Sequence, residues 1–358
     1  MRIVSQESRS GVALLMVMVA IFVLSVMVGA FAYAMKVETK LAQTANNEEN
    51  LIWLGRSGVE LARYVLAEQM TVNGEPYDSL NQKWAGGPGG IASSNSPLAG
   101  ISLDNFSVGD GSVTIKITDL ERKINVNMAN EPIFQQALTS MGVDASEAPG
   151  IIDGILDWID PDDATHANGA ESDYYQSMDP PYFAKNGAID DLSELLLIRG
   201  ISQDVYWGAA STNHTAAAFQ QVDRLGRPIQ QPVYSAGLVD IFTPISTGRV
   251  NINTASATVL QAIPGIDQNM ADQIIKLRSG PDGADGTDDD TPFLNVGEVI
   301  NAGVSRQAVQ QVAQYCDVRS RTFEVRVEAE IGGTKRTFYA IVGRNSPRDL
   351  PVLSFYWK

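Results

Sequence analysis

The sequence is poor in the residues that most often carry catalysis or bind transition metals. Its 358 residues contain one cysteine, Cys316, and two histidines, His166 and His214. A single cysteine cannot form an internal disulfide, which excludes a disulfide-stabilised secreted scaffold. A zinc site or a histidine-based catalytic site would need nearly all three side chains in one place, and no motif in the sequence arranges them so. We therefore expect a protein that is not an enzyme.

Basic side chains are scarce relative to acidic ones. The chain has 26 Lys and Arg against 42 Asp and Glu, which gives a net charge of -16 at pH 7. A surface of this sign repels phosphate groups. The charge balance therefore predicts that the protein does not bind nucleic acid.

One segment near the N-terminus lacks charged residues altogether. The 24 residues from Val12 to Met35 are almost all apolar and contain no proline. A helix of about 20 such residues spans a bilayer. The run begins directly after Gly11, behind a short polar leader. Three interpretations remain open: a signal peptide cut within residues 30–34, an uncut signal anchor, or a type IV prepilin-like leader cut between Gly11 and Val12.

A helical pattern continues beyond the apolar run. Residues 36–70 contain no proline, and Leu51, Leu54, Leu61 and Val65 recur at helical spacing. We predict one continuous helix over residues 12–70, about 88 Å long at 1.5 Å per residue. Turn residues at positions 73–76 end it.

An internal repeat organises the middle of the chain. The segment Lys123–Ala129 (KINVNMA) is echoed 126 residues later by Arg249–Ala255 (RVNINTA). After each segment come two predicted helices, an acidic loop and a further helix. The helices are expected at 132–141 and 151–159 in the first copy, and at 256–263 and 269–278 in the second. This order predicts a tandem duplication over residues 123–208 and 249–315, joined by a segment with strand candidates at 230–234 and 238–242.

Predicted strands flank the duplication. Residues 112–118 alternate apolar and polar side chains, and so do residues 322–331 and 334–342 around the turn Gly332-Gly333. Strands on both sides of a helical block most simply belong to one sheet. We therefore predict an α+β head in two pieces, 71–122 and 319–358, with an α-helical domain, 123–318, inserted between its strands.

The second copy resembles the helix-hairpin-helix motif of competence-type DNA receptors, at Arg249–Ala257, Ile263–Ile266 and Ala271–Arg278. In that motif, backbone N–H groups next to two glycines hold a phosphate. Here Asp267 stands in place of the second glycine, and its carboxylate would repel the phosphate. We favour a hairpin that only packs two helices, and a membrane-anchored DNA-binding protein remains the alternative.

Clusters of carboxylates occupy equivalent loops of the two copies. The first loop contains Asp157, Asp160, Asp162, Asp163, Glu171 and Asp173, and the second contains Asp282, Asp285, Asp288, Asp289 and Asp290. Flexible loops rich in oxygen ligands suit Ca²⁺, which takes 6–8 of them. Neither loop has the D-x-D-x-D-G spacing. The candidate ligands are Asp160, Asp162, Asp163, Glu171, Asp173, Asp282, Asp285, Asp288, Asp289 and Asp290.

Six short motifs occur together along the chain: Gly11–Leu15 (GVALL), Arg122–Asn127 (RKINVN), Asp157–Asp162 (DWIDPD), Gly169–Glu171 with Tyr174 and Tyr175, Leu192–Leu195 (LSEL) and Val250–Ala255 (VNINTA). In this combination the chain as a whole resembles the minor pseudopilin K family of bacterial type II secretion. The resemblance implies a type IV pilin-like fold: a long N-terminal helix and an antiparallel sheet, here with the duplicated helix-hairpin-helix-like domain inserted. It also implies Ca²⁺ in the head, without locating it.

The resemblance further implies processing and assembly. Prepilin peptidase would remove residues 1–11 and leave Val12 as an N-methylated terminus. Most pilins have Glu at the fifth mature position, whereas this chain has Met16. The Glu neutralises a neighbour's buried terminal amine, so its loss suits a subunit at the pseudopilus tip.

The expected partners are other minor pseudopilins in a tip complex, the major pseudopilin, prepilin peptidase and the inner membrane, with a single-pass helix and the head in the periplasm. The tip subunit of a type IV pilus is a further alternative.

Overall fold

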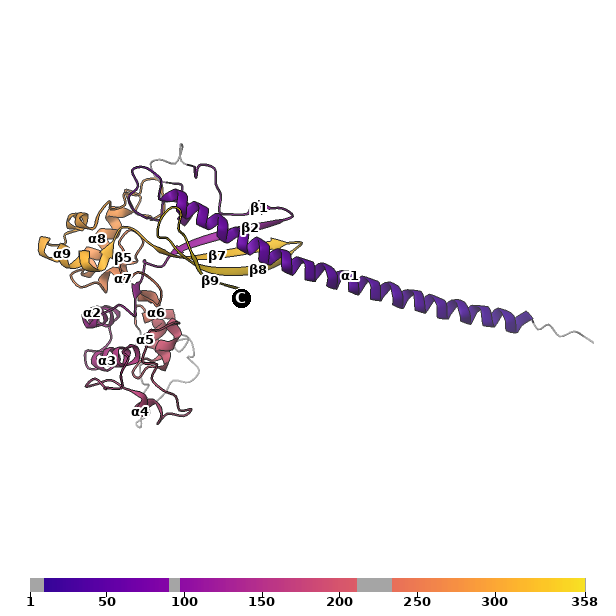
Figure 1. The fold of residues 1–358 in the computed structure, drawn as a ribbon, viewed down its shortest axis with the longest axis horizontal. Helices are drawn as coiled ribbons and strands as arrows, with labels where there is room; N and C mark the ends of the chain where they lie inside the picture. The colour runs from indigo at the N-terminus through magenta and orange to yellow at the C-terminus, as the bar shows by residue number, and fades with distance from the viewer. Residues whose placement is uncertain (1–9, 90–96, 211–233, 358) are drawn as a thin grey trace, which may run out of the picture.

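The molecule consists of one long helix and a head that lies at one end of it (Figure 1). A computed structural model describes residues 10–89, 97–210 and 234–357. Helix α1 runs from Ser10 to Gln69. Its 60 residues correspond to a length of about 90 Å. The long helix predicted from the sequence is therefore continuous from the apolar run into the head.

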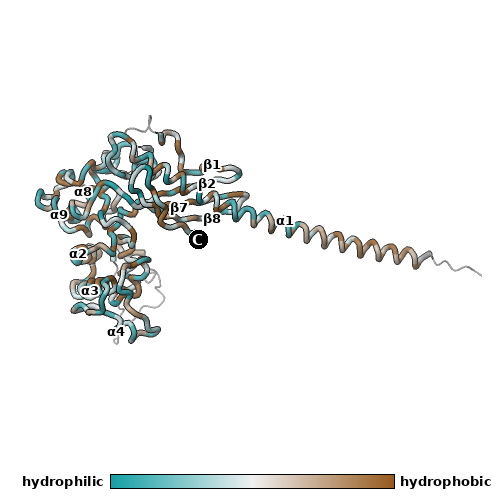
Figure 2. The backbone as a smooth tube through the Cα atoms, viewed as in Figure 1, coloured by the Kyte–Doolittle hydropathy of each residue, from teal (hydrophilic) through white to brown (hydrophobic). Residues whose placement is uncertain are grey.

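The two halves of α1 have different surroundings. Residues 12–35 are exposed along their whole length, and Figure 2 shows this half as the most hydrophobic stretch of the helix. It is the one helix among the described residues that is long and apolar enough to cross a membrane. The second half buries Leu51, Leu54, Ala62 and Leu66 against the head. Helix α1 thus has an unpartnered apolar half and a half that belongs to a protein core.

The head contains a five-stranded antiparallel sheet in the order β1-β2-β7-β8-β9. The strands are β1 (Phe106–Val108), β2 (Gly111–Asp119), β7 (Thr322–Ile331), β8 (Thr334–Gly343) and β9 (Val352–Trp357). Strands β2 and β7 pair along their whole lengths, from Gly111 opposite Ile331 to Asp119 opposite Phe323. The predicted α+β fold, with a domain inserted between neighbouring strands, is confirmed. The edge strands β1 and β9 were not predicted, because neither shows an alternating pattern of useful length.

Helix α1 approaches the sheet closely at two glycines. A Cβ atom added at Gly55 would lie 2.5 Å from the Phe338 ring, and one at Gly58 would lie 2.5 Å from the Val327 side chain. Any larger side chain would therefore push the helix away from β7 and β8. These contacts belong to a core formed by α1, the sheet and Trp84 of the short helix η1 (Lys83–Ala85).

The inserted segment folds as two related units. The first contains β3 (Ile124–Asn125), α2 (Glu131–Met141), α3 (Ala148–Ile159), α4 (Ser172–Tyr175), η2 (Leu192–Leu197), α5 (Gln203–Trp207), η3 (Gly208–Ala210), α6 (Leu238–Ile241) and β4 (Phe242–Thr243). The second contains β5 (Val250–Asn251), α7 (Ala257–Gln261), α8 (Gln268–Arg278), η5 (Val296–Ala302), α9 (Arg306–Tyr315) and β6 (Cys316–Asp317). In each unit the first strand pairs in parallel with the last.

The strand predicted at 238–242 is wrong for most of its length. Residues 238–241 form α6, whose first turn is capped by the Asp240 carboxylate accepting a hydrogen bond from the Gly237 backbone N–H at 2.9 Å. Only Phe242 and Thr243 are extended, as β4. A short apolar run does not distinguish a buried helical turn from a strand. Most of the other candidate, 230–233, lies outside the described residues.

The second asparagine of each repeated N-x-N segment has the same role in both units. The Asn127 side chain accepts a hydrogen bond from Ile189 N at 2.7 Å and donates one to Ile189 O at 2.9 Å. The Asn253 side chain accepts from Phe293 N at 2.8 Å and donates to Phe293 O at 3.0 Å. Each asparagine therefore pairs with the backbone where the chain returns from the acidic loop, which explains why the repeated motif and the loops occur together.

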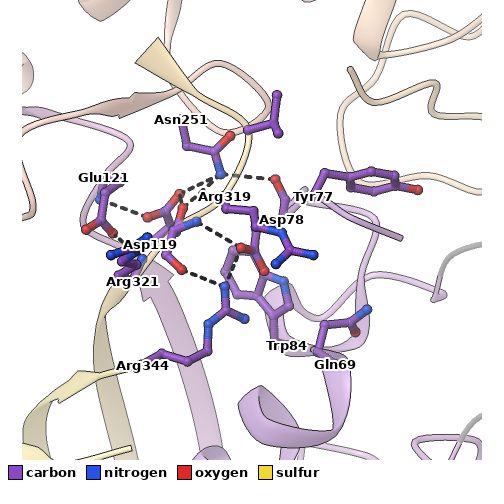
Figure 3. A network of polar contacts seen from close by, with 12 residues as sticks. Gln69, Tyr77, Asp78, Trp84, Asp119, Glu121, Asn251, Arg319, Arg321 and Arg344 are labelled. Atoms are coloured by element: carbon purple, nitrogen blue, oxygen red, sulfur yellow. Dashed lines mark hydrogen bonds and ion pairs between the residues drawn. The ribbon is translucent and has the colours of Figure 1, made fainter. Parts of the chain in front are cut away.

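A buried polar network joins the inserted units to the sheet (Figure 3). At the end of β2, Asp119 Oδ2 accepts hydrogen bonds from Asn251 Nδ2 at 3.2 Å, Thr254 Oγ1 at 2.5 Å and Ser320 Oγ at 2.6 Å. Two residues later, the Glu121 carboxylate accepts from the backbone N–H groups of Thr247, Arg321 and Thr322. Asp119 therefore connects the end of β2 to the second unit, and Glu121 connects the chain after β2 to the segment before β5 and to the start of β7.

The asparagine contacts predict a large loss of stability on truncation. Changing Asn253 to Ala would leave the buried N–H and C=O groups of Phe293 without partners. We expect a loss of about 2–4 kcal/mol in the free energy of unfolding, measured by urea denaturation of the full chain in detergent. The exposed Asn301 offers a matched control, and Asn301→Ala should change stability by less than about 0.5 kcal/mol. Equal effects of the two changes would contradict the prediction.

The network also predicts how stability depends on pH. Burial, together with the negative charges of Glu121 and Asp78, raises the pKa of Asp119 from 3.8 to about 7, although hydrogen bonds from Ser320 and Thr254 favour the ionised form. Between these values the folded protein binds more protons than the unfolded chain, so the free energy of unfolding falls as pH rises from about 4 to 7.

The contribution of this one carboxyl is at most about 1.4 kcal/mol per pH unit. Urea denaturation at several pH values should give a shallower slope for Asp119→Asn than for the wild type over that range. If the two slopes coincide, Asp119 does not titrate as described.

Candidate metal site

The acidic loop of the first unit has three largely buried carboxylates at the ends of α3 and α4. Asp157 lies in the last turn of α3 and is fully buried. Asp160 is the residue that follows the helix, and Glu171, which is 4% exposed, directly precedes α4. The ends of two helices therefore position the three side chains, although ten residues lie between Asp160 and Glu171 along the chain.

The geometry around Asp157 is suited to a cation. One possible ligand atom each of Asp157, Asp160 and His166 lies within 4.8 Å of the other two. Gly169 borders the same space, since a Cβ atom added there would lie 1.9 Å from Asp157 Oδ2. The loop can therefore pass close to the carboxylate only because this residue has no side chain.

The oxygens of this cluster lack protein partners. Asp157 Oδ2, Asp160 Oδ1 and both carboxylate oxygens of Glu171 are buried without a hydrogen bond from any described residue. Buried carboxylates are costly unless they are paired, hydrogen-bonded or bound to a metal. The donor set consists of hard oxygen atoms, which is the set that Ca²⁺ prefers. The residues present therefore fit a calcium ion.

The charges in the cluster disfavour its ionised state when no cation is present. Burial, with the negative charges of Asp157 and Asp160, raises the pKa of Glu171 to about 7. The pKa of Asp160 is also raised, mainly by burial and by the charge of Asp162. His166 Nδ1 contacts Asp157 Oδ1, and this hydrogen bond raises the pKa of the imidazole. His166 thus neutralises part of the charge from the exposed side.

The structure separates the predicted ligands of the first loop into two groups. Asp160 belongs to the group of possible ligands around Asp157, and Glu171 is buried where the charges of Asp157 and Asp160 act on it. Asp162, Asp163 and Asp173 are exposed. Asp163 Oδ1 accepts hydrogen bonds from Ser172 Oγ at 3.1 Å and Asn186 Nδ2 at 3.0 Å, so it fastens the loop to a later segment. Asp157 is the most buried carboxylate. It was recognised in the loop but not chosen as a ligand, and its position on the buried face of α3 could have identified it.

The carboxylates of the second loop have partners within the protein. Arg278, which is 4% exposed, donates to Asp285 Oδ1 at 3.0 Å and to Asp285 Oδ2 at 2.6 Å. The side chains of Asp282, Asp289 and Asp290 accept hydrogen bonds from backbone or hydroxyl groups of the same loop, and Asp288 is exposed. Among the described residues, this loop forms no group of three converging ligands. In this loop the positive charge that neutralises a carboxylate comes from the Arg278 side chain.

An acidic side chain of the hairpin between α7 and α8 caps the second helix. Gly265 has a φ of +97°, and Asp267 caps α8, its Oδ1 accepting a hydrogen bond from Met270 N at 2.8 Å. The carboxylate therefore occupies the helix N-terminus where a helix-hairpin-helix protein would hold a phosphate. This arrangement supports the interpretation of the hairpin as a packing element.

The predicted processing junction lies at the start of α1. Gly11 and Val12 are within the helix, and Val12 and Met16 belong to its exposed apolar half. Cleavage and methylation at these residues remain predictions.

Comparisons with known proteins give a consistent assignment. Residues 113–211 match the family described as type II secretion system (T2SS), protein K, and residues 246–281 match the helix-hairpin-helix motif. The type II secretion system protein K of Pseudomonas aeruginosa is 22% identical over 98% of this chain and 93% of its own length. The protein of the same name from Pectobacterium carotovorum is 32% identical over 28% of this chain and 35% of its own.

A solved structure has the same fold. It is described as the GspK-GspI-GspJ complex from the type 2 secretion system of enterotoxigenic Escherichia coli, and the matching chain has a TM-score of 0.61 at 18% identity. The match covers 88% of this chain and 99% of the solved one, so the two chains share most of their fold. Along nearly its whole length the chain is similar to protein K of type II secretion systems, and the comparisons support a minor pseudopilin of that system.

Proposed function

We propose that this protein is the tip subunit of a type II secretion pseudopilus and that its head lies in the periplasm. The proposal rests on the two halves of helix α1. One half is exposed and apolar, and the other half is part of the core of the head. Such a helix can be anchored once in the inner membrane and later pack among the helices of a fibre. The acidic first loop, with its unpaired oxygens, supports a structural ion rather than a catalytic role.

The size of the head supports a terminal position. The insertion between β2 and β7 contains both helical units and their own core, which is separate from the core under α1. A subunit stacked above this one would have to accommodate that mass. Met16 adds a second argument, because a buried terminal amine above it would lack a neutralising carboxylate, at a cost of several kcal/mol.

The partners that we propose are other minor pseudopilins. The solved relative was crystallised with two further proteins of its secretion system, and its fold matches over most of this chain. The major pseudopilin would lie below the tip complex, and prepilin peptidase would process the chain between Gly11 and Val12. Helix α1 is the element of this chain that would contact neighbouring helices.

We propose that Ca²⁺ binds between α3 and α4. Asp157, Asp160 and Glu171 would hold it, because their buried oxygens lack other partners. The ion would neutralise clustered carboxylates and fix the loop between the two helices. The second loop remains a candidate only for a weaker calcium site, because the Arg278 guanidinium already neutralises Asp285 there. Its carboxylates are Asp282, Asp285, Asp288, Asp289 and Asp290.

The processing and tip assignment predict a defined N-terminus and a defined location. Mass spectrometry of the protein from its host should show a chain that starts at N-methylated Val12. Gold-labelled antibodies against the head should mark one end of overproduced pseudopili, whereas antibodies against the major pseudopilin should mark the sides. A start near residue 36, or labelling by head antibodies along the shaft, would contradict the assignment.

The calcium proposal predicts a loss of thermal stability on chelation. With Ca²⁺ at about 100 times its Kd, binding stabilises the folded state by about 2.7 kcal/mol, so EDTA should lower the melting temperature of the full chain by several degrees. Glu171→Gln should abolish the EDTA effect and the calcium heat in calorimetry. Gly169→Ala should weaken both, because the new methyl group displaces Asp157.

The second loop provides the matched control for this experiment. Asp288→Asn removes an exposed carboxylate and should leave calcium binding unchanged. If Asp288→Asn abolishes binding while Glu171→Gln retains it, the ion lies in the second loop.

A further inference from the structure

An exposed apolar loop lies at the end of the first unit, next to α4. We call residues 176–187 the tip loop. Met178 is 43% exposed and Phe183 is 69% exposed, and the two prolines between them, Pro180 and Pro181, are also exposed. Figure 1 shows α4 at the end of this lobe farthest from the sheet, and the lobe extends sideways from the head, apart from the apolar half of α1. Met178 and Phe183 belong to neither core.

The tip loop is held in one conformation by contacts behind it. Met178 N and Tyr182 N both donate to Tyr175 O, at 3.2 and 3.3 Å, and Tyr182 Oη donates to Leu197 O at 2.7 Å. The ring of Tyr182 stacks on the buried ring of Tyr175 with their centroids 5.1 Å apart. A surface that is already ordered loses little conformational entropy when a partner binds. These contacts favour a docking role over a mobile connection.

The tip loop is also fastened to the candidate metal site. Asn186 Nδ2 donates to Asp162 O at 2.9 Å and to Asp163 Oδ1 at 3.0 Å, and Gly187 N donates to Trp158 O at 3.3 Å. Trp158 follows Asp157 directly, and its ring also meets that of Tyr182 edge-on. An ion that fixes the carboxylate loop therefore fixes the base of the tip loop.

The negative charge around the tip loop indicates the charge that a partner would need. Residues 123–210 contain fifteen acidic and three basic side chains, a net charge of -12 out of -16 for the whole chain. Of the three basic side chains, Lys185 is paired with Asp190 and Glu194, and Arg199 is hydrogen-bonded to Gly169 O. An apolar surface in such a field attracts a partner with basic side chains and repels anionic lipid headgroups.

We propose that the tip loop is a calcium-dependent docking surface for exported proteins, recognised through an apolar recess bordered by lysine and arginine side chains. The proposal rests on the function proposed above. Phe183 and Met178 would enter the recess, and the carboxylates around the loop would face the basic border. Exported proteins are favoured over a membrane as the partner, because the acidic surroundings repel anionic lipid headgroups and the lobe with α4 lies apart from the apolar half of α1 (Figure 1).

The binding experiment uses the full chain in detergent and, as probe, a fluorescently labelled, purified cargo protein of the host's own type II system. The double variant Met178→Asp/Phe183→Asp should weaken binding at least tenfold while retaining the wild-type melting temperature and calcium affinity. The control Leu294→Asp, at a residue 50% exposed in the second unit, should bind as the wild type does. EDTA should weaken wild-type binding at least tenfold, and so should an increase in salt from about 0.05 M to 0.5 M.

Equal binding by the double variant and the wild type would overturn the proposal, as would binding that EDTA or salt leaves unchanged. Retention on phosphatidylglycerol vesicles in place of cargo binding would also overturn it and would indicate a membrane contact. A host strain that lacks the protein separates this proposal from the proposed function. If that strain still secretes normally, the proposed function fails. If its secretion stops and the double variant restores it fully, only the docking proposal fails.

Discussion

The pairing of β2 with β7 is the constraint on which the rest of the structure depends. About two hundred residues separate the two strands in sequence, yet they pair over nine positions and form the centre of the sheet under α1. An insertion of this size can be placed between paired strands only if its two ends lie close together. Two carboxylates hold these ends together. Asp119 accepts hydrogen bonds from Asn251 of the second unit and from Ser320, and Glu121 accepts them from the backbone at Arg321 and Thr322, where β7 starts. The inserted units are thereby fixed to the sheet by buried hydrogen bonds, each dependent on the others.

The two helical units show how one duplicated framework can stabilise an acidic loop in two ways. In both, an asparagine pairs with the backbone at the end of the loop. In the second unit, the buried Arg278 supplies the positive charge and binds Asp285 through both carboxylate oxygens. In the first unit, Trp158 and Asp157 lie at the end of the corresponding helix, and the exposed His166 is the one cationic side chain paired with Asp157 among the described residues. That difference is why the first loop suits a calcium ion and the second does not need one.

The fold class, the long helix, the central strands and most of the helices were predictable, because each depends on a local pattern. Apolar spacing identified α1, alternation identified β2, β7 and β8, and the repeated N-x-N segment identified the duplication. The errors occurred where no local pattern exists. Residues 238–241 are a helical turn, since a short apolar run is ambiguous, and β9 gains its order from stacking of Phe355 on Phe338 and Tyr356 on Tyr339.

The sequence by itself determined that the protein has an uncharged segment long enough to span a membrane, a head in two pieces and two acidic loops. Hydropathy, periodicity and charge are local properties of the chain, so they can be read without the fold. Only the tertiary structure decided which carboxylates converge. Asp157 joins Asp160 and His166, with Gly169 passing close to its carboxylate, whereas Asp285 is bound by Arg278. The physical reason is that a carboxylate's role depends on the cation and the burial that other segments bring to it. Spacing along the chain specifies neither.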